Sequence, residues 1–500
     1  MSITRTRFRR ILGVVGFVAI AVASLGCAEP PLLPSITLSR CAEPDYPIDA
    51  KCTALEVPEN PASPDGRKIS LNIVVLPASG RGGDEPVFFL AGGPGQAATD
   101  LAAAMANVLP RVNSSHDFVF VDQRGTGKSN PLDCEMSQEG ATEPLGTEQR
   151  LDILRACLEE LDADPRYYTT PIAMDDLDAV RRALAYGRIN LIGSSYGTRA
   201  ALVYMRRHAE TVRSVVLDAV APMSLHLPES MAADSQRAFD LLAKACKEQP
   251  ECHAAYPDFE KLFAELLESF STPRRVSATD PFTGQVREIT IDRDQIAMWV
   301  FGSLYGANFS SLIPLAIESA YGGDWGPFAA LLSNNADLGD GLSYGMRLSV
   351  ICAEDIPFVD KNSNAYSNTF LGHYAVREMV ADCAVWPRGD IPDGYHEAVR
   401  SDIPTLVLSG ELDPVTPPRW GEQAARSLSR SKHVVLAGVG HGVQMVPCGA
   451  GLIEDFIKDP NIDELDVECA ATSSRPAIFA STVGAVPLAE PSNESDRKAP

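Results

Sequence analysis

Short runs rich in hydrophobic residues recur along the chain, and most end in glycine or polar residues. They occupy residues 87–90, 118–121, 190–193, 214–218, 404–409 and 433–436. Runs of four to six residues without polar alternation are typical of parallel strands that are buried on both faces. Two further segments, 52–58 and 69–76, also have strand character, and a Pro-Asp-Gly turn at 64–66 separates them.

Helical spacing of apolar residues appears between these strands. Residues 175–186 are predicted to form a helix, with Asp175 and Asp176 near its positive N-terminal end, and residues 198–208 form another. Helical patterns then dominate one long block of the chain, at residues 231–247, 259–270, 294–304 and 373–383. Strand and helix therefore alternate, except where this block interrupts them.

The pattern predicts an α/β protein with a doubly wound, mostly parallel sheet. Residues 35–220 and 396–470 would form the two parts of the sheet domain. Residues 221–395 would form a mostly helical cap inserted between them. The segment 471–500 is rich in Ala, Ser, Pro and charged residues, and we expect it to be a disordered tail.

The first 27 residues have the features of a signal peptide. Four arginines precede an apolar stretch at 11–25, which ends in Gly26-Cys27-Ala28. The stretch is too short for a membrane span, and no later segment is long and apolar enough for one. The residues before Cys27 resemble a bacterial lipobox, which would place a lipid anchor on Cys27; ordinary cleavage near Ala28 is the alternative. We expect an exported protein, periplasmic or secreted, or a membrane-anchored lipoprotein.

Composition excludes some classes of partner. The formal net charge is −23, whereas a nucleic-acid partner requires a basic surface. The chain has no C-x-x-C or H-E-x-x-H motif, so we expect no metal and no cofactor. Apart from Cys27, ten cysteines remain, an even number that in an oxidising compartment indicates disulfides. Pairing of sequence neighbours would give Cys41–Cys52, Cys134–Cys157, Cys246–Cys252, Cys352–Cys383 and Cys448–Cys469.

A G-x-S-x-G sequence at 193–197 lies between a predicted strand and a predicted helix. Such a sharp turn needs small residues on both sides of the serine, and it exposes the serine hydroxyl above the sheet. We therefore predict Ser195 as a nucleophile. The backbone N–H of Tyr196, at the start of the helix, is the predicted first donor of an oxyanion hole.

A serine hydroxyl needs a base, and His441 follows the last predicted strand within a glycine-rich loop. Asp413 follows the preceding strand and is the predicted carboxylate that orients the histidine, with Glu411 as the alternative. The order Ser, Asp, His along the chain is the order of α/β-hydrolases.

Two other glycine-containing loops follow strands. The loop at 90–95 contains Gly92, the predicted second oxyanion donor. The segment Gly-Thr-Gly-Lys-Ser at 125–129 superficially resembles the end of a phosphate-binding loop, but Asp122 and Gln123 occupy the region where the required first glycine would stand. We interpret Asp122 and Arg124 as structural residues that brace loops near the site.

Together, Gly-Gly-Pro-Gly at 92–95, Asp-Gln-Arg-Gly at 122–125, G-x-S-x-G at 193–197, Asp-Pro-Val-Thr-Pro at 413–417 and Gly-His-Gly at 440–442 resemble the prolyl and tripeptidyl aminopeptidase family of α/β-hydrolases. The resemblance extends from about residue 52 to 469. Segments that begin at the cysteines 352, 383, 448 and 469 are similar to the secreted tripeptidyl members. The resemblance implies the triad Ser195, Asp413 and His441 beneath a cap that selects substrates.

The sequence departs from this family at two points. Ala91 stands where proline iminopeptidases usually have histidine, and only Glu354 and Asp355 suggest the cap carboxylates that hold the free amine of the substrate.

Three functional hypotheses follow. The first is an exported serine aminopeptidase that releases residues or short peptides from free N-termini through an acyl-enzyme. The second is a carboxylesterase, or another hydrolase of small esters or amides, that uses the same triad. The third is a binding protein with this fold but no catalysis, against which the intact triad counts.

Overall fold

A computed structural model describes residues 36–43, 46–47, 49–80, 85–134, 136, 145–279, 283–331, 341–361, 363 and 366–485. The predicted signal peptide, including Cys27, lies outside these residues, as does the end of the predicted tail from residue 486. Within the described ranges, no helix combines the length and hydropathy that crossing a bilayer would require.

A nine-stranded sheet forms the centre of the described chain, in the order β1-β2-β3-β5-β4-β6-β7-β10-β11. The strands from β5 to β11 are parallel, whereas β1, β2 and β3 pair antiparallel at one side. Their bounds are Ser39–Arg40 (β1), Lys51–Pro58 (β2), Lys68–Leu76 (β3), Val87–Leu90 (β4), Phe118–Val121 (β5), Ile189–Ser194 (β6), Val212–Asp218 (β7), Thr405–Gly410 (β10) and Ser431–Leu436 (β11). Every residue of β4 and β5 is buried, which confirms the prediction of strands covered on both faces.

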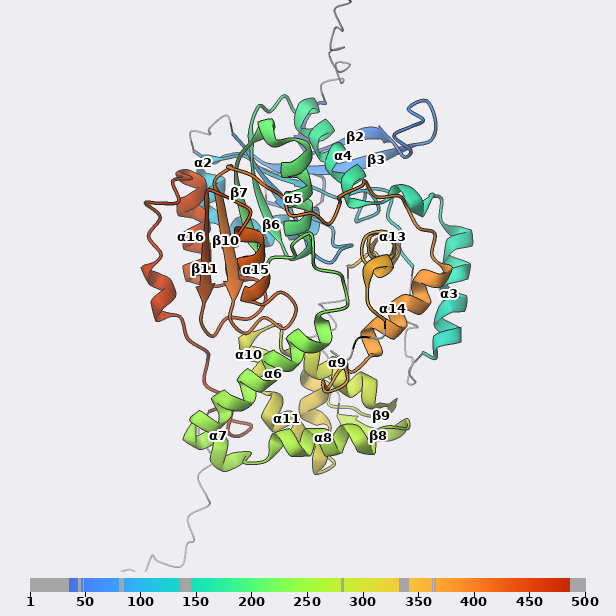
Figure 1. Ribbon diagram of the computed structural model, residues 1–500, viewed down its shortest axis with the longest axis vertical. Coiled ribbons are helices and arrows are strands. Elements are labelled where there is room, and N and C mark those ends of the chain that lie inside the picture. Colours follow the sequence, from blue (N-terminus) through green and yellow to red (C-terminus); the bar gives the residue numbers. More distant parts are fainter. Residues whose placement is uncertain are drawn as a thin grey trace, which may run out of the picture. The chain divides into compact units, whose positions relative to one another are not determined.

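Helices cover both faces of the sheet (Figure 1). One face carries α1 (Ala102–Val108), α2 (Pro110–Ser115) and α16 (Pro447–Lys458), which share one apolar cluster with the strands. The other face carries α4 (Thr170–Ala183), α5 (Tyr196–Arg207) and α15 (Pro418–Ala425). The predicted doubly wound arrangement is thus present, and it brings the carboxyl ends of the parallel strands to one edge.

The helix predicted from residue 175 begins five residues earlier, at Thr170, with Pro171 in its first turn. Asp175 and Asp176 therefore do not lie at its N-terminus. Asp176 instead receives two hydrogen bonds from the guanidinium of Arg124, whose Nε lies 2.7 Å from Oδ2. Arg124 also donates to the carbonyl of Glu59, so the predicted bracing role of this arginine is confirmed.

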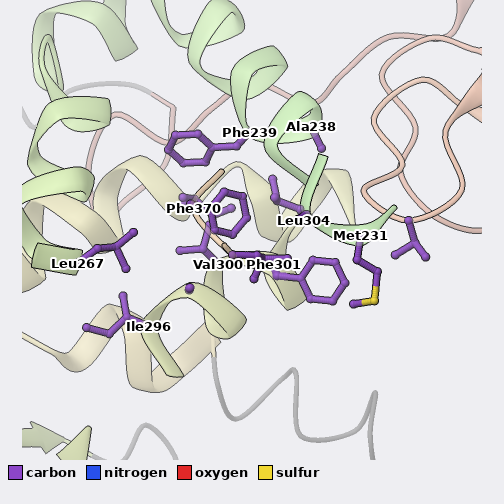
Figure 2. Packing of buried hydrophobic residues seen from close by; sticks show 14 of the residues in the cluster. Met231, Ala238, Phe239, Leu267, Ile296, Val300, Phe301, Leu304 and Phe370 are labelled. Atoms are coloured by element: carbon purple, nitrogen blue, oxygen red, sulfur yellow. The ribbon is translucent and has the colours of Figure 1, made fainter. Parts of the chain in front are cut away.

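The helices of the inserted block, here called the cap, bury one large apolar cluster (Figure 2), which also includes Leu151, Leu154 and Ile478 from outside the block. Phe239, Leu267, Val300 and Phe370 come from different segments of the block and are buried together. Its helices are α6 (Met231–Glu248), α7 (Pro250–Ala255), α8 (Phe259–Ser269), α9 (Arg293–Ser303), α10 (Ala307–Ser310), α11 (Ile313–Tyr321), α13 (Tyr344–Glu354) and α14 (Tyr374–Val385). A two-stranded hairpin, β8 (Arg274–Thr279) and β9 (Val286–Ile291), adds strand structure that the helical pattern did not indicate.

Two helices form contacts between the cap and the sheet domain that were not predicted from the sequence. Helix α3 (Thr147–Glu160), within the first part of the sheet domain, contacts α14, and Arg150 of α3 forms an ion pair with Asp382 at 2.8 Å. Helix α13, within the cap segment, packs against Tyr168 and Tyr196 of the sheet domain.

The tail prediction is wrong for residues 471–485. The side-chain amide of Gln249 on α6 both donates to and accepts from the backbone of Ile478, each at 2.8 Å. Ile478 is 1% exposed, and Phe479 N–H donates to the carbonyl of Ser311. The buried side chain of Ile478 and these hydrogen bonds attach to the cap a segment whose composition suggested disorder.

Five cysteine pairs lie at disulfide distance, with sulfur–sulfur separations of 1.92–2.05 Å. They are the five neighbour pairs expected from sequence order. Cys352–Cys383 joins α13 to α14, and Cys246–Cys252 joins α6 to α7.

The two cap disulfides provide a matched test of their contribution to stability, since both are buried but close loops of 31 and 6 residues. Replacing Cys352 and Cys383 by alanine should lower the free energy of unfolding by about 3.5 kcal/mol, and replacing Cys246 and Cys252 by about 2 kcal/mol, because a longer loop restricts the unfolded chain more. Urea unfolding measures both values. Unfolding of the wild type that is unchanged by a reducing agent would contradict the disulfide assignment.

Candidate active site

The predicted nucleophile lies on a sharp turn between β6, which ends at Ser194, and α5, which begins at Tyr196. Ser195 has φ 56° and ψ −123°, a strained conformation for a residue with a side chain. A Cβ atom on Gly197 would lie 2.0 Å from the carbonyl oxygen of Leu90, and one on Gly193 would lie 2.5 Å from that of Gly197. Both flanking glycines are therefore required by close backbone packing, as the motif predicts.

His441 and Asp413 form a direct pair. Nδ1 of His441 lies 2.8 Å from Oδ2 of Asp413, which is fully buried. The backbone N–H groups of Val415 and Thr416 donate to Oδ1, and the hydroxyl of Thr416 donates to Oδ2, each at 2.8 Å. These bonds fix the carboxylate, and the pairing leaves Nε2 of His441 for a substrate or for Ser195.

The alternative carboxylate, Glu411, has a different role. Its Oε2 accepts a hydrogen bond from the N–H of Gly438 at 2.9 Å, which ties together the loops after β10 and β11. Of the two acidic residues considered from the sequence, the structure places only Asp413 against the histidine.

The pair shifts both pKa values in the direction that general-base chemistry needs. Burial alone lowers the pKa of His441, but the negative charge and hydrogen bond of Asp413 outweigh it and raise the pKa above its usual value. For Asp413, burial acts to raise the pKa, but the interactions with His441 and with the N–H groups of Thr416 and Val415 lower it. The carboxylate therefore stays ionised beside an imidazole that accepts a proton readily.

The histidine loop is held from two sides by residues that the sequence analysis did not identify. Asp218, at the end of β7, accepts hydrogen bonds from the N–H groups of Val443 and Gln444, both at 2.9 Å. Burial raises the pKa of Asp218 to about 6, although these two donors act to lower it. The available sequence signal was an acidic residue directly after the apolar residues 215–217.

The second support comes from the cap. The N–H of His441 donates to the carbonyl of Tyr305 at 2.8 Å, and the Tyr305 ring lies edge-on to the imidazole with centroids 5.1 Å apart. A Cβ atom on Gly440 would lie 2.1 Å from the same carbonyl. The cap therefore orients the histidine as well as covering it, a contact between distant segments that no local pattern could reveal.

The predicted oxyanion donors lie beside the serine. A Cβ atom on Gly92 would lie 3.2 Å from Cβ of Ser195, so the loop after β4 passes directly against the turn. Tyr196 is the first residue of α5, where backbone N–H groups lack helical partners. Thr99 and Lys128 donate backbone hydrogen bonds to Asp122, which braces the neighbouring loops as predicted.

A cavity of about 660 Å³ opens beside Ser195, Gly92 and His441. Its walls are mainly apolar. They come from the sheet domain and from the cap, which contributes Trp299 and Phe301. Among the described residues, no group of three or more His, Cys, Asp or Glu side chains is arranged to hold a metal ion.

Glu354 and Asp355 do not line this cavity, so the prediction that they hold a substrate amine is wrong. Glu354 accepts hydrogen bonds from the backbone and hydroxyl of Thr170 and from Tyr395, and Asp355 pairs with Arg199 at 2.9 Å. Both carboxylates are fully buried. They join α13 to the sheet domain, and internal partners occupy the charges that a ligand would need.

Comparison with known proteins agrees with this architecture. Residues 85–447 match the model of the alpha/beta hydrolase fold family. The chain therefore belongs to the α/β-hydrolase family, the class that the sheet and the serine turn define.

Three relatives with different names match over most of the chain. The serine protease Hip1 of Mycobacterium tuberculosis is 23% identical, covering 90% of this chain and 95% of that protein. The tripeptidyl aminopeptidase of Streptomyces lividans is also 23% identical, covering 86% and 85%. A protein named carboxylesterase B, from M. tuberculosis, is 26% identical over 76% of this chain and 78% of its own. Among solved structures, a proline iminopeptidase from M. smegmatis is 16% identical with a TM-score of 0.38, covering 82% and 99%.

The Asp413–His441 pair leads to a prediction for catalysis. Asp413→Asn should lower kcat for ester or amide hydrolysis by about 10³–10⁴-fold, because the amide no longer favours the required tautomer or stabilises the imidazolium. Glu411→Gln is the matched control, since its amide oxygen can still accept from Gly438, and it should stay within a few-fold of the wild type.

The pH profile provides an independent measurement. Activity requires neutral His441, so kcat/KM should rise with pH through a histidine pKa that lies above its ordinary value. Removing the charge of Asp413 leaves burial as the main influence, so the acid limb of Asp413→Asn should move to lower pH. An acid limb that does not move would show that Asp413 does not act on this histidine.

Proposed function

We propose that the protein is a serine peptidase that works through an acyl-enzyme, with Ser195 as nucleophile, His441 as general base and Asp413 as the residue that orients the base. The observation that carries this proposal is the buried 2.8 Å contact between Asp413 and His441, beside the cavity that Ser195 lines. The strained turn at Ser195 is further support.

The proposed reaction has two stages. Ser195 Oγ attacks the carbonyl carbon of the substrate while its proton passes to Nε2 of His441, and the N–H groups of Gly92 and Tyr196 stabilise the negative oxygen. The proton then passes from His441 to the leaving nitrogen, which departs as an amine. Water attacks the acyl-enzyme with His441 again as the base, and the acid product leaves Ser195.

Space for a leaving peptide favours amide over small-ester substrates. A second cavity, of about 740 Å³, shares Tyr305, His441 and Met445 with the first but does not include Ser195. The acyl part of a substrate must lie beside the serine, whereas the leaving group must lie beside the histidine that protonates it. A second cavity that also borders His441 offers room for a leaving group as long as a peptide segment.

Release of short peptides from the N-terminus is the favoured mode. Relatives named tripeptidyl aminopeptidase and serine protease align over more than four-fifths of the chain. A carboxylesterase that uses the same triad is the second candidate, and the relative named carboxylesterase B keeps it open. Five disulfides fit the proposed export to the periplasm or exterior, where thiols are oxidised.

A peptide library with free N-termini, incubated with wild type and with Ser195→Ala and analysed by mass spectrometry, tests this function. The wild type should release short N-terminal fragments, and Ser195→Ala should lose at least about 10³-fold in rate because no acyl-enzyme can form. Ser194→Ala, which removes the neighbouring hydroxyl, should keep activity within about tenfold.

Turnover of p-nitrophenyl esters, with no product from any peptide, would favour the carboxylesterase. Equal product profiles from the wild type and Ser195→Ala would contradict the catalytic assignment itself.

A further inference from the structure

The charge balance of the cavity beside Ser195 differs from that of the chain as a whole. The chain carries a formal net charge of −23, yet the described lining of this cavity contains no Asp or Glu. Apart from the histidine of the triad, Arg347 is the only basic side chain in that lining. The part of the site that holds the acyl portion of a substrate is thus locally positive.

Arg347 has no protein partner for its charge. Its guanidinium makes no ion pair and no hydrogen bond within the described structure, whereas Arg124, Arg150 and Arg199 each bind a carboxylate. Nearby cavity walls are formed by Trp299, Leu342 and other apolar side chains. Arg347 is half-buried among these walls, so a ligand that supplies the opposite charge would gain a charge-assisted hydrogen bond in a partly dehydrated site.

The position of Arg347 is fixed relative to the oxyanion loop. It lies in the first turn of α13, and its N–H donates to the carbonyl of Ser343 at 3.0 Å. The N–H of Ser343 in turn donates to the carbonyl of Gly95 at 3.0 Å, and Leu342 forms a β-bridge with Gln96. The segment that carries Arg347 is therefore attached to the loop that contains Gly92. The charge also reaches the histidine side of the site. Burial and the charge of Asp413 raise the pKa of Tyr305, whose ring packs against His441, and the charge of Arg347 acts against them.

We propose that Arg347 is a specificity residue that binds a carboxylate on the acyl part of the substrate, either an acidic side chain or a carboxylate attached at the N-terminus. The inference rests on the proposed peptidase function, since it places the acyl portion beside Ser195. A guanidinium binds a carboxylate through two parallel N–H donors, so the preference concerns charge and shape together. An ammonium group close to Arg347 would instead be repelled.

Pairs of isosteric substrates test this proposal. Tripeptide anilides with Glu or Gln at each of the three positions, together with succinyl- and acetyl-capped trialanine anilides, differ in charge but little in size. At one of these positions or at the cap, the wild type should show kcat/KM at least about tenfold higher for the carboxylate, as expected for a charge-assisted hydrogen bond. The arm that shows the preference identifies the source of the carboxylate.

Variants then assign the preference to this residue. The quantity compared is the ratio of kcat/KM for the carboxylate substrate to kcat/KM for its neutral partner. Arg347→Gln should bring this ratio close to one, and Arg347→Lys should keep part of the preference. Arg347→Glu should reverse the preference in favour of a Lys-containing peptide. Arg275→Gln is the matched control, because it removes an exposed arginine of the cap hairpin, and it should leave the ratio unchanged. A purely structural role for Arg347 would lower all rates together without changing the ratio.

The outcomes separate this inference from the proposed function. If peptides are cleaved but every carboxylate-to-neutral ratio in the wild type is near one, or if the ratio survives in Arg347→Gln, the inference is wrong and the peptidase proposal stands. If no peptide is cleaved, the same peptides serve as competitors of fluorophosphonate labelling. Stronger protection by the carboxylate member of a pair, lost in Arg347→Gln, would then support the inference, and equal protection would overturn it.

Discussion

The position of one imidazole, that of His441, depends on contacts from three separate parts of the chain. The carboxylate of Asp413 binds its Nδ1, the carbonyl of Tyr305 accepts a hydrogen bond from the backbone N–H of His441, and Asp218 binds the backbone just beyond it. None of these residues is a sequence neighbour of the histidine. The geometry of the site is therefore a property of the whole fold, and the cap is part of the catalytic scaffold as well as a cover.

The sheet domain and most of the candidate site could be predicted because they rest on local rules. A strand buried on both faces is a short apolar run. A serine on a strand-to-helix turn needs flanking glycines that avoid backbone contact, so the roles of Gly193 and Gly197 could be predicted from the sequence. The carboxyl ends of parallel strands meet at one edge, and this placed Ser195, Asp413 and His441 near one another before any coordinates. The choice between Asp413 and Glu411 needed the structure, since both lie in the same loop.

The errors arise where long-range contacts override local pattern. Glu354 and Asp355 suggested a ligand site as a pair of acids, but Thr170 and Arg199, distant in the sequence, occupy them. Residues 471–485 have the composition of a disordered tail, yet Ile478 is buried against the cap and its backbone is hydrogen-bonded to Gln249. The sequence analysis did not identify Arg347, because a single arginine does not form a motif. Only the structure shows that it lies in an apolar cavity without a partner for its charge among the described residues.

The central claim is that Ser195 is activated by His441. Mapping the adduct formed by a fluorophosphonate probe, by peptide mass spectrometry together with the rate of its formation, tests this claim most directly. The account predicts an adduct on Ser195 that forms far more slowly in a folded His441→Ala variant, and at the wild-type rate in a variant of the exposed His253. An adduct on another residue, or labelling of Ser195 that is equally fast without His441, would contradict it.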